Sequence, residues 1–350
     1  MFTPEANTPH SEKLETLCAT LRDLSTETVR IGPWQSGGFA ELAKSGSLAG
    51  FLPSDIGGTG GAELAKLLFL TAIAESCLTT ALAVSQWAAA CRIINVADND
   101  IRTRWLPDII DGRSLTTIGI SQLTTSRQHL GKKVLVAHED ANGWQLNGVC
   151  PWVTGADSVD TIVTGAMTDH GQRFFVIETS TPGLFVEPPM QMLALSGSRT
   201  SLVRLNGVKA TSVITPMDGA GARTGGLSTT ALALGAAKAS IAIIRNESIK
   251  RSELRSIAEQ LSSEVLGLIE RLHVAATMGL EKDDQDQLRA DANGVVVRAA
   301  QAALVACKGA GFVHGHLAEQ VVRESMFFLV WSCPQAVAHA VMCDLVGNIE

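Results

Sequence analysis

The chain has 350 residues, which is long for a single hydrophobic core and suits two or three packed units. Apolar residues make up 46% of it and charged residues 18%, so we expect a well-buried globular protein and exclude an intrinsically disordered one. The formal net charge is -7, and no run of five or more basic residues occurs. Because phosphate binding depends on clustered Lys and Arg, the composition argues against nucleic acid as a partner.

The seven cysteines are irregularly spaced and include no Cys-x-x-Cys pair. This pattern predicts neither a zinc site nor a disulfide framework, and we expect reduced thiols, no metal and a cytoplasmic location. His314 and His316 are two residues apart, but no third ligand is spaced to join them. A solvated pair of histidines is therefore the simpler interpretation.

Neither the N-terminal residues nor the most apolar stretch has the pattern of a targeting or membrane segment. The first 15 residues contain three glutamates and no apolar run, so we expect no signal peptide. The most apolar stretch, from about 64 to 97, is interrupted by Lys66, Glu75 and Arg92. A buried helix pair explains this stretch better than a membrane span, and we expect no membrane partner.

The first third of the chain has a mostly helical pattern. Helices are expected at Ser11–Val29, Phe39–Ser45, Ala62–Glu75, Thr79–Asn95 and Ile101–Ile110. The third and fourth of these are apolar on most faces, as helices inside a bundle are.

From Leu115 to about Thr215, short β-branched runs alternate with turns rich in Gly, Asn, Asp and Pro. The runs are 115–121, 134–137, 144–147, 161–166, 174–178, 184–187 and 202–206. Their spacing predicts a small antiparallel barrel or sandwich.

The segment from Gly143 to Ala156 is the most informative part of this region. It alternates apolar and polar residues up to Asn147-Gly148, which predicts a hairpin turn there. In the strand that follows, Trp152 and Thr154 are two residues apart and should share a face. An aromatic plane beside a hydroxyl suits a flat, polar heterocycle. The alternative is a tryptophan that merely fills the core.

The last third of the chain is helical again. One apolar stripe repeats at steps of three and four residues: Ile257, Leu261, Val265, Leu268 and Leu272. A further helix is expected to begin at Asp283-Asp284, with acid at its positive end, and to stop at Gly309–Gly311 before two shorter helices.

The whole pattern predicts an α+β multidomain protein. Its expected parts are an N-terminal helical domain at 1–114, a middle β domain at 115–216 and a C-terminal helical bundle at 217–350. Helices that are apolar all round, such as 231–244, predict a homodimer or homotetramer, because such a surface needs covering.

Six local motifs occur in a fixed order over nearly the whole chain. They are Gly50–Pro53 with Gly57–Gly60, Trp105–Pro107 with Asp111–Gly112, Trp152 with Thr154, Phe175–Leu184, Leu195–Ser201, and Gly309–Phe312 with Val322–Ser325. Together with the order of helices and strands, these motifs resemble the acyl-CoA dehydrogenase family. The resemblance implies an N-terminal helical bundle, a central antiparallel β-barrel or sandwich and a C-terminal four-helix bundle.

The same resemblance implies a flavin cofactor, FAD ahead of FMN, and a small-molecule substrate such as an acyl-CoA. The residues at the family's cofactor-binding positions are Ser121, Ser126, Trp152, Thr154, Arg251, Gly309 and Gly311. The chain departs from the family pattern at several places: the loop after Gln122 is shortened, and the Phe and Gly that should follow Arg251 are missing with several further residues. Gln122 replaces a glutamate, and Lys308 replaces the first glycine of a glycine motif.

The larger departure concerns the catalytic base. Dehydrogenation in this family needs a carboxylate that removes a proton next to the thioester carbonyl. Ser332 occupies the usual position of that glutamate, and Ser228 occupies the position that a minority of members use. The catalytic residue is therefore unknown from the sequence, and a displaced acid such as Glu324 or Glu247 would have to act.

Three functions remain open at this point. The first is an acyl-CoA dehydrogenase-like flavoprotein oxidoreductase that oxidises a CH–CH bond of an acyl thioester with a displaced base. The second is a flavin-dependent monooxygenase on the same fold, which uses oxygen and needs no carboxylate base. The third is a non-catalytic oligomeric scaffold, which would explain the departures in both the base and the cofactor motifs.

Overall fold

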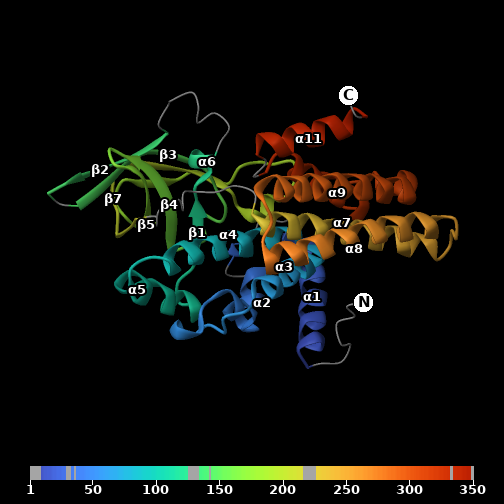
Figure 1. Ribbon diagram of the computed structural model, residues 1–350, viewed down its shortest axis with the longest axis horizontal. Coiled ribbons are helices and arrows are strands. Elements are labelled where there is room, and N and C mark those ends of the chain that lie inside the picture. Colours follow the sequence, from blue (N-terminus) through green and yellow to red (C-terminus); the bar gives the residue numbers. More distant parts are fainter. Residues whose placement is uncertain are drawn as a thin grey trace.

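The computed structural model describes residues 9–28, 33–34, 37–124, 134–141, 143–215, 226–331 and 334–347. Helices, then strands, then helices follow one another along the chain, and Figure 1 shows the sheet at one end of the molecule beside the helices. The predicted α+β multidomain fold class is confirmed. The domain limits remain predictions; the last long helix before the sheet ends at Ile110, and the first after it begins at Leu227.

The N-terminal part contains α1 (Pro9–Thr28), α2 (Gly38–Lys44), α3 (Glu63–Ser76), α4 (Leu78–Asn95) and α5 (Asn99–Ile110). Helix α4 is rich in Ala, Leu and Val and is buried along most of its length. It packs against α3 on one side and against strand β1 (Thr116–Gly119) on another. The apolar stretch from 64 to 97 is therefore a buried helix pair, as its charged interruptions predict.

The middle part is built on one sheet. After β1, its strands are β2 (Leu135–Asp140), β3 (Gly143–Val153), β4 (Thr161–Thr168), β5 (Gly171–Glu178), β6 (Leu184–Val186), β7 (Ser201–Lys209) and β8 (Ser212–Ile214). The strand order is β6-β7-β3-β2-β4-β5-β8, and β1 pairs with β4. Most neighbours are antiparallel, and the structure adds two parallel pairings, of β1 and of β2 with β4.

The hairpin turn lies earlier than predicted. Strands β2 and β3 pair up to Asp140 and Gly143, so the chain reverses between these two residues. Asn147 and Gly148 lie inside β3, at a register shift in its pairing with β7. Gly148 has a φ of 134°, and a Cβ on it would overlap the Val134 carbonyl oxygen. The prediction of a turn at Asn147-Gly148 is wrong, because this glycine serves a bulge and a close strand approach.

The C-terminal part contains α7 (Leu227–Ser248), α8 (Leu254–Met278), α9 (Lys282–Gly311), α10 (Leu317–Ser325) and α11 (Gln335–Leu345). As predicted, α8 buries Val265, Leu268 and Leu272, and α9 has Asp283 and Asp284 in its first turn. Figure 1 shows α7, α8 and α9 running side by side, with α11 beside α9.

Helix α7 is the centre of this bundle. It packs against α3, α8 and α9, and so joins the two helical parts of the molecule. By length and composition alone α7 would suit a membrane span, but 67% of its most apolar stretch is buried inside the molecule. A core helix of a globular protein has the same character, and its packing accounts for its composition.

The sheet is held against both groups of helices. The Trp34 ring covers Gly155, just beyond the end of β3, where a Cβ would overlap the indole. From the C-terminal part, Arg323 of α10 donates a hydrogen bond to the Leu193 carbonyl oxygen at 3.0 Å. Gly155, just after β3, therefore contacts the N-terminal part, and the connection between β6 and β7 contacts α10.

Candidate functional site

The end of β3 carries the Trp–Thr pair that was predicted to flank a planar ligand. Trp152 is 55% exposed, so its indole ring lies open and does not fill the core. Thr154, by contrast, is buried. The pairing of β3 with β7 shifts register between Cys150 and Val153, so strand alternation does not decide the directions of the two side chains, and their common face stays a prediction. The result is an open aromatic ring two residues from an inward-facing hydroxyl.

Thr154 belongs to a buried chain of hydroxyl groups that the sequence did not reveal. Its Oγ1 lies 3.2 Å from Thr200 Oγ1, which in turn lies 2.9 Å from Ser198 Oγ. Thr117 Oγ1 donates to the Thr154 carbonyl oxygen at 2.8 Å. Because a hydroxyl both donates and accepts, this chain fixes the Thr154 side chain and retains capacity for a ligand atom. The only sequence signal is the hydroxyl-rich turn at 198–201.

A second buried polar cluster surrounds Gln122, shortly after β1. Its Nε2 lies within hydrogen-bonding distance of the carbonyl oxygens of Gly119 (3.2 Å) and Gly165 (2.7 Å) and of Thr164 Oγ1 (3.2 Å). Its Oε1 accepts a hydrogen bond from the Cys150 thiol at 3.0 Å. Burial raises the pKa of Cys150 to about 12, so this thiol stays protonated and can donate. These partners of Gln122 all belong to the sheet and its connections.

Of the two serines predicted to bind the cofactor, only Ser121 lies within the described residues. Ser121 begins the short helix α6 (Ser121–Thr124), and its hydroxyl slightly opposes the rise in the pKa of the Cys150 thiol. Ser126 lies outside the described residues, and so does Ser332 at the predicted base position. Their roles stay predictions.

The segment that leads to position 332 is anchored to α9. It includes a 3-10 turn, η6 (Met326–Leu329). Asn293 Nδ2 donates to the Phe328 carbonyl oxygen at 2.9 Å, and Arg289 Nη2 lies 3.3 Å from the Trp331 carbonyl oxygen. The buried Arg289 guanidinium is also 5.8 Å from the Trp331 ring centroid, within cation–π range. Helix α9 thus fixes the backbone just before the predicted base position.

Helix α10 carries a glutamate, Glu324, whose pKa is raised above its ordinary value. Glu324 is buried, and its carboxylate accepts a hydrogen bond from Gln320 Nε2 at 2.9 Å. Burial raises the pKa of Glu324 to about 7, against the opposing effects of that hydrogen bond and of the Arg323 charge. The pKa of Glu319 is lowered instead, chiefly by the hydrogen bond from Arg323. A buried carboxyl that titrates near neutral pH is a candidate general base.

Arg251 lies in the turn between α7 and α8, next to a break in α9. Its Nη2 donates both to the Glu247 carboxylate and to the Ala306 carbonyl oxygen. The first contact pairs the guanidinium charge, and the second gives a donor to a carbonyl beside the break. Arg251 therefore has partners within its own chain.

The two glycines predicted to approach a cofactor also differ from each other. A Cβ on Gly311 would lie 2.6 Å from Cys307 Cβ and 3.3 Å from Ala318 Cβ, so the absent side chain makes room for α10. Gly309 is exposed and has open space around it. Of these two glycines, only Gly309 presents free backbone surface.

Lys308 has a backbone conformation that glycine normally adopts. Its φ of 55° and ψ of -146° interrupt the helical dihedrals of α9. A Cβ is poorly accommodated there, and such residues store about 1–3 kcal/mol of strain. The departure from the glycine motif therefore changed the side chain while the backbone kept the glycine geometry.

Replacing Lys308 with glycine is expected to stabilise the protein by about 1 kcal/mol, the strain relieved less the extra chain entropy of glycine. Lys308→Ala removes the same ammonium group but keeps the Cβ and its strain, so it should leave stability nearly unchanged. Thermal unfolding followed by circular dichroism measures both variants. Equal stabilities of the two variants would show that the backbone of Lys308 is not strained.

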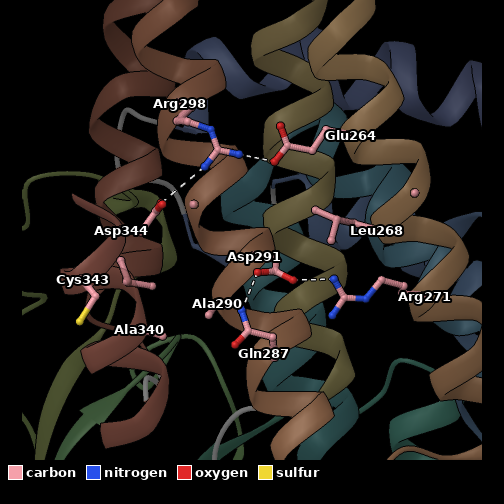
Figure 2. A pocket seen from close by; sticks show the side chains of 13 residues that line it. Glu264, Leu268, Arg271, Gln287, Ala290, Asp291, Arg298, Ala340, Cys343 and Asp344 are labelled. Carbon is pink, nitrogen blue, oxygen red and sulfur yellow. Dashed lines mark hydrogen bonds and ion pairs between the residues drawn. The ribbon is translucent and has the colours of Figure 1, made fainter. Parts of the chain in front are cut away.

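A cavity of about 600 Å³ lies between α8, α9 and α11. Figure 2 shows its two groups of ion pairs: Arg298 bridges Glu264 of α8 and Asp344 of α11, and Arg271 pairs with Asp291. Each of these charged groups has a partner of opposite sign within the chain. The ion pairs thus help to hold α11 on the bundle, and no local sequence pattern indicates them.

The two histidines near the start of α10, His314 and His316, have different surroundings. His316 Nδ1 accepts a hydrogen bond from the Ala318 N–H at 3.0 Å and caps α10. His314 is exposed, beside Glu319. Within the described part of the chain, no group of three or more His, Cys, Asp or Glu is arranged to hold a metal ion.

Comparisons with known proteins agree with this architecture. Residues 12–113 match the family model of the acyl-CoA dehydrogenase N-terminal domain. A curated relative, the acyl-CoA dehydrogenase FadE12 of Mycobacterium tuberculosis, is 28% identical over 180 residues, which are 49% of this chain and 45% of that protein. The match therefore spans about half the length of the curated relative. Butyryl-CoA dehydrogenase from Megasphaera elsdenii has a similar fold, with a TM-score of 0.82 and 17% identity over 98% of this chain and 100% of that one.

The chain is thus similar in sequence to the acyl-CoA dehydrogenase family over residues 12–113, and it has the fold of the acyl-CoA dehydrogenases. The same fold also occurs in proteins with other titles. A dibenzothiophene monooxygenase from Paenibacillus sp. has a TM-score of 0.77 and 15% identity over 96% of each chain. KijD3, solved with FMN and a dTDP-sugar, has a TM-score of 0.76 and 18% identity over 99% of this chain and 96% of that one. The likeness to acyl-CoA dehydrogenases therefore shows the fold and leaves the reaction open.

The residues near the end of β3 fit a flavin ring more clearly than the residues near the break in α9 fit the rest of the cofactor. The open Trp152 ring offers an aromatic face, and the hydroxyl chain at Thr154 offers a hydrogen-bonding group, as a flat, polar ring system requires. At the α9 break, Arg251 and Gly311 are engaged within the chain. The ring-binding end is thus the better-formed part of this candidate site.

Proposed function

We propose that this protein is a flavin-dependent oxidoreductase that oxidises a CH–CH bond of an acyl thioester. The proposal is carried by the open Trp152 ring beside the Thr154 hydroxyl chain, on the fold of the acyl-CoA dehydrogenase family. A bound flavin, FAD or FMN, supplies the redox chemistry. The chain's own part is to hold the ring system between these groups and to take up the proton.

Glu324 is the acid we assign to the proton in this proposal. A base works best when its pKa lies near the working pH, and burial brings the pKa of Glu324 to about 7. The other displaced acid considered, Glu247, is already bonded to Arg251. The charge of that guanidinium favours the carboxylate form of Glu247 and weakens it as a base.

A monooxygenase is the second candidate. Serine stands at both positions where the family places its catalytic glutamate, 332 and 228. Reaction with oxygen needs no such carboxylate, and the fold is shared with a dibenzothiophene monooxygenase. A non-catalytic scaffold is the third, favoured by the engaged Arg251 and by the lysine at 308.

The surface of the C-terminal part bears on the assembly of the protein. Large apolar side chains are exposed on the C-terminal part: Ile249, Leu266, Met278, Val305, Phe312 and Val330. A contiguous apolar surface formed by such side chains would need covering by another subunit, and on that basis we propose a homodimer or homotetramer. A cytoplasmic location is proposed from the cysteine pattern alone.

The visible absorption spectrum of the purified protein, before and after addition of excess flavin and desalting, tests flavin binding. About one flavin per chain is the expected result. Bleaching of the flavin absorbance by an acyl-CoA without a reductase would support thioester oxidation. Oxygen consumption that requires an external flavin reductase would support the monooxygenase instead. A colourless protein that retains no flavin would exclude both the dehydrogenase and the monooxygenase function and leave the non-catalytic scaffold.

Replacing Trp152 with alanine is expected to weaken flavin binding about tenfold, because the ring loses its aromatic contact. Trp152→Phe keeps an aromatic face and should retain most of the affinity. Titration followed by flavin fluorescence measures both variants. If alanine at 152 binds flavin as tightly as tryptophan does, the ring does not contact the cofactor.

A further inference from the structure

We infer that the indole nitrogen of Trp34 donates a hydrogen bond to a carbonyl oxygen of the flavin ring. The inference rests on the proposed flavin binding and deepens it by naming a binding residue that lies outside the sheet. Trp34 belongs to none of the motifs that resemble the acyl-CoA dehydrogenase family, and it lies between α1 and α2 in the N-terminal part of the chain. Its position, its nitrogen and its fixed orientation carry the assignment.

The Trp34 ring lies against the backbone at the point where β3 ends. A Cβ on Gly155 would lie 2.4 Å from both Cε2 and Cζ2 of the indole, so the glycine allows the ring to approach the chain closely. Nε1 is bonded to Cε2 and is therefore near this contact. Gly155 directly follows Thr154, whose hydroxyl chain is part of the candidate flavin site, and Trp152 is three residues earlier. The Trp34 side chain is thus adjacent to that site.

The Nε1 atom of Trp34 is a buried donor. It has no hydrogen-bond partner within the described part of the chain, and the side chain is only 4% exposed, so bulk water does not serve it. An unsatisfied buried donor is costly, and nearly all buried N–H groups in native proteins have a partner. An indole nitrogen can only donate, so the group that suits it is an acceptor.

Neighbouring aromatic side chains fix the orientation of this donor. Phe39 of α2 stacks on the Trp34 ring, with centroids 5.3 Å apart and planes inclined by 23°. Phe39 in turn contacts the ring of Trp87 in α4 edge-on, at a centroid distance of 6.1 Å, and all three side chains are buried. A donor held in this way loses little conformational freedom when it bonds a ligand, so it is preorganised for binding.

The flavin ring carries an acceptor of the required kind. Its pyrimidine half has two carbonyl oxygens at the edge of the ring plane. The open Trp152 indole offers a surface to the face of the ring system, while Thr154 and Trp34 offer groups that can hydrogen-bond to its edge. The carbonyl oxygen of a bound thioester has the same acceptor chemistry, and the experiment separates these two sources.

The experiment is an indole N–H correlation NMR titration of the full-length protein, freed of flavin and labelled with nitrogen-15 in its six tryptophans. FAD or FMN is added first, and an acyl-CoA second. The Trp34 signal, assigned by its loss in Trp34→Phe, should move downfield on addition of flavin, because hydrogen bonding deshields the proton. The Trp105 signal should stay in place, because Trp105 Nε1 already donates to Ser212 Oγ at 2.9 Å.

Trp34→Phe keeps an aromatic ring and removes the donor, so it should weaken flavin binding about tenfold, the effect of one lost hydrogen bond. Trp105→Phe is the matched control, because it makes the same change at another buried tryptophan whose N–H is engaged within the chain. This control should bind flavin as tightly as the unchanged protein. Flavin fluorescence measures the affinities, and near-UV circular dichroism shows whether each variant folds.

The outcomes separate the inference from the proposed function. An unchanged flavin affinity in folded Trp34→Phe overturns the contact. If flavin binds and the Trp34 signal does not move, the contact is also overturned, even where Trp34→Phe does not fold. A signal that moves only after the acyl-CoA is added assigns the bond to the thioester and overturns the flavin contact. If no flavin binds, the proposed function fails, and the inference fails with it.

Discussion

Replacing Gly235 with alanine is expected to destabilise the protein by about 3 kcal/mol, an overpacking penalty at a close helix contact. A Cβ at this position would overlap the Thr71 carbonyl oxygen and would lie 2.6 Å from Ala74 Cβ and 3.0 Å from the Glu75 nitrogen. These are backbone atoms or the first side-chain carbon, so rotation of a side chain gives no relief. Helices α3 and α7 would have to move apart, although their contact joins the two helical parts of the molecule.

Gly267 provides the matched control, because it is also a helical glycine but is exposed on α8. A Cβ there meets no atom within 4 Å. Gly267→Ala is therefore expected to stabilise the protein by about 0.5–1 kcal/mol, the usual gain when glycine leaves a helix interior. Urea unfolding followed by far-UV circular dichroism measures both variants. Stabilisation by alanine at both positions would refute the close packing of α3 against α7.

The sequence predicted the helices well because their signals are local. The apolar stripe of α8 repeats at helical spacing, and the acidic pair Asp283-Asp284 marks the start of α9. Helix α4 is apolar on most faces and buried along most of its length, so its composition reflects its environment, whereas α3 is buried mainly along its second half.

The turn in the β region shows why local signals fail for sheets. Asn-Gly occurs twice, at 142–143 and at 147–148, and both pairs lie among alternating residues. Only the pairing of β2 with β3 decides between them, and it puts the reversal between Asp140 and Gly143. A shift in the register of β3 with β7, between Cys150 and Val153, likewise interrupts the alternation that would relate Trp152 to Thr154.

The site itself depends on contacts that no local pattern encodes. The hydroxyl pair of Thr154 and Thr200 spans 46 residues, and the bond from Arg251 to Ala306 spans 55. A family motif gave the positions of Thr154 and Arg251 but not their partners. Similarly, a lysine at position 308 gives no sign in the sequence that its backbone has a positive φ, the conformation that glycine normally adopts.

Replacing Gln122 with glutamate is the second change with a large expected effect, a loss of about 4 kcal/mol at neutral pH, because a buried carboxylate would face backbone carbonyl oxygens. Gly119 and Gly165 present those oxygens to the Gln122 amide nitrogen, at 3.2 and 2.7 Å. The exposed Gln260 of α8 provides a control, and glutamate there should change stability by no more than about 0.5 kcal/mol.

The loss should depend on pH, and its sign follows from burial. Burial would raise the folded-state pKa of a glutamate at 122 above its unfolded value of about 4.3, so the folded state would bind the extra proton. The penalty should therefore grow as pH rises from about 5 to 8 and shrink in acid. Denaturant unfolding across this range measures it.

This result also decides what the departure at Gln122 means. The family pattern has glutamate here, so a lost cofactor contact would be restored by Gln122→Glu, with flavin affinity raised and stability little changed. The contacts of Gln122 with Gly119, Gly165, Thr164 and Cys150 lead to the opposite expectation. The amide donates to these carbonyl oxygens, which a carboxylate would repel, so restoring the family residue should unfold the sheet before it improves cofactor binding.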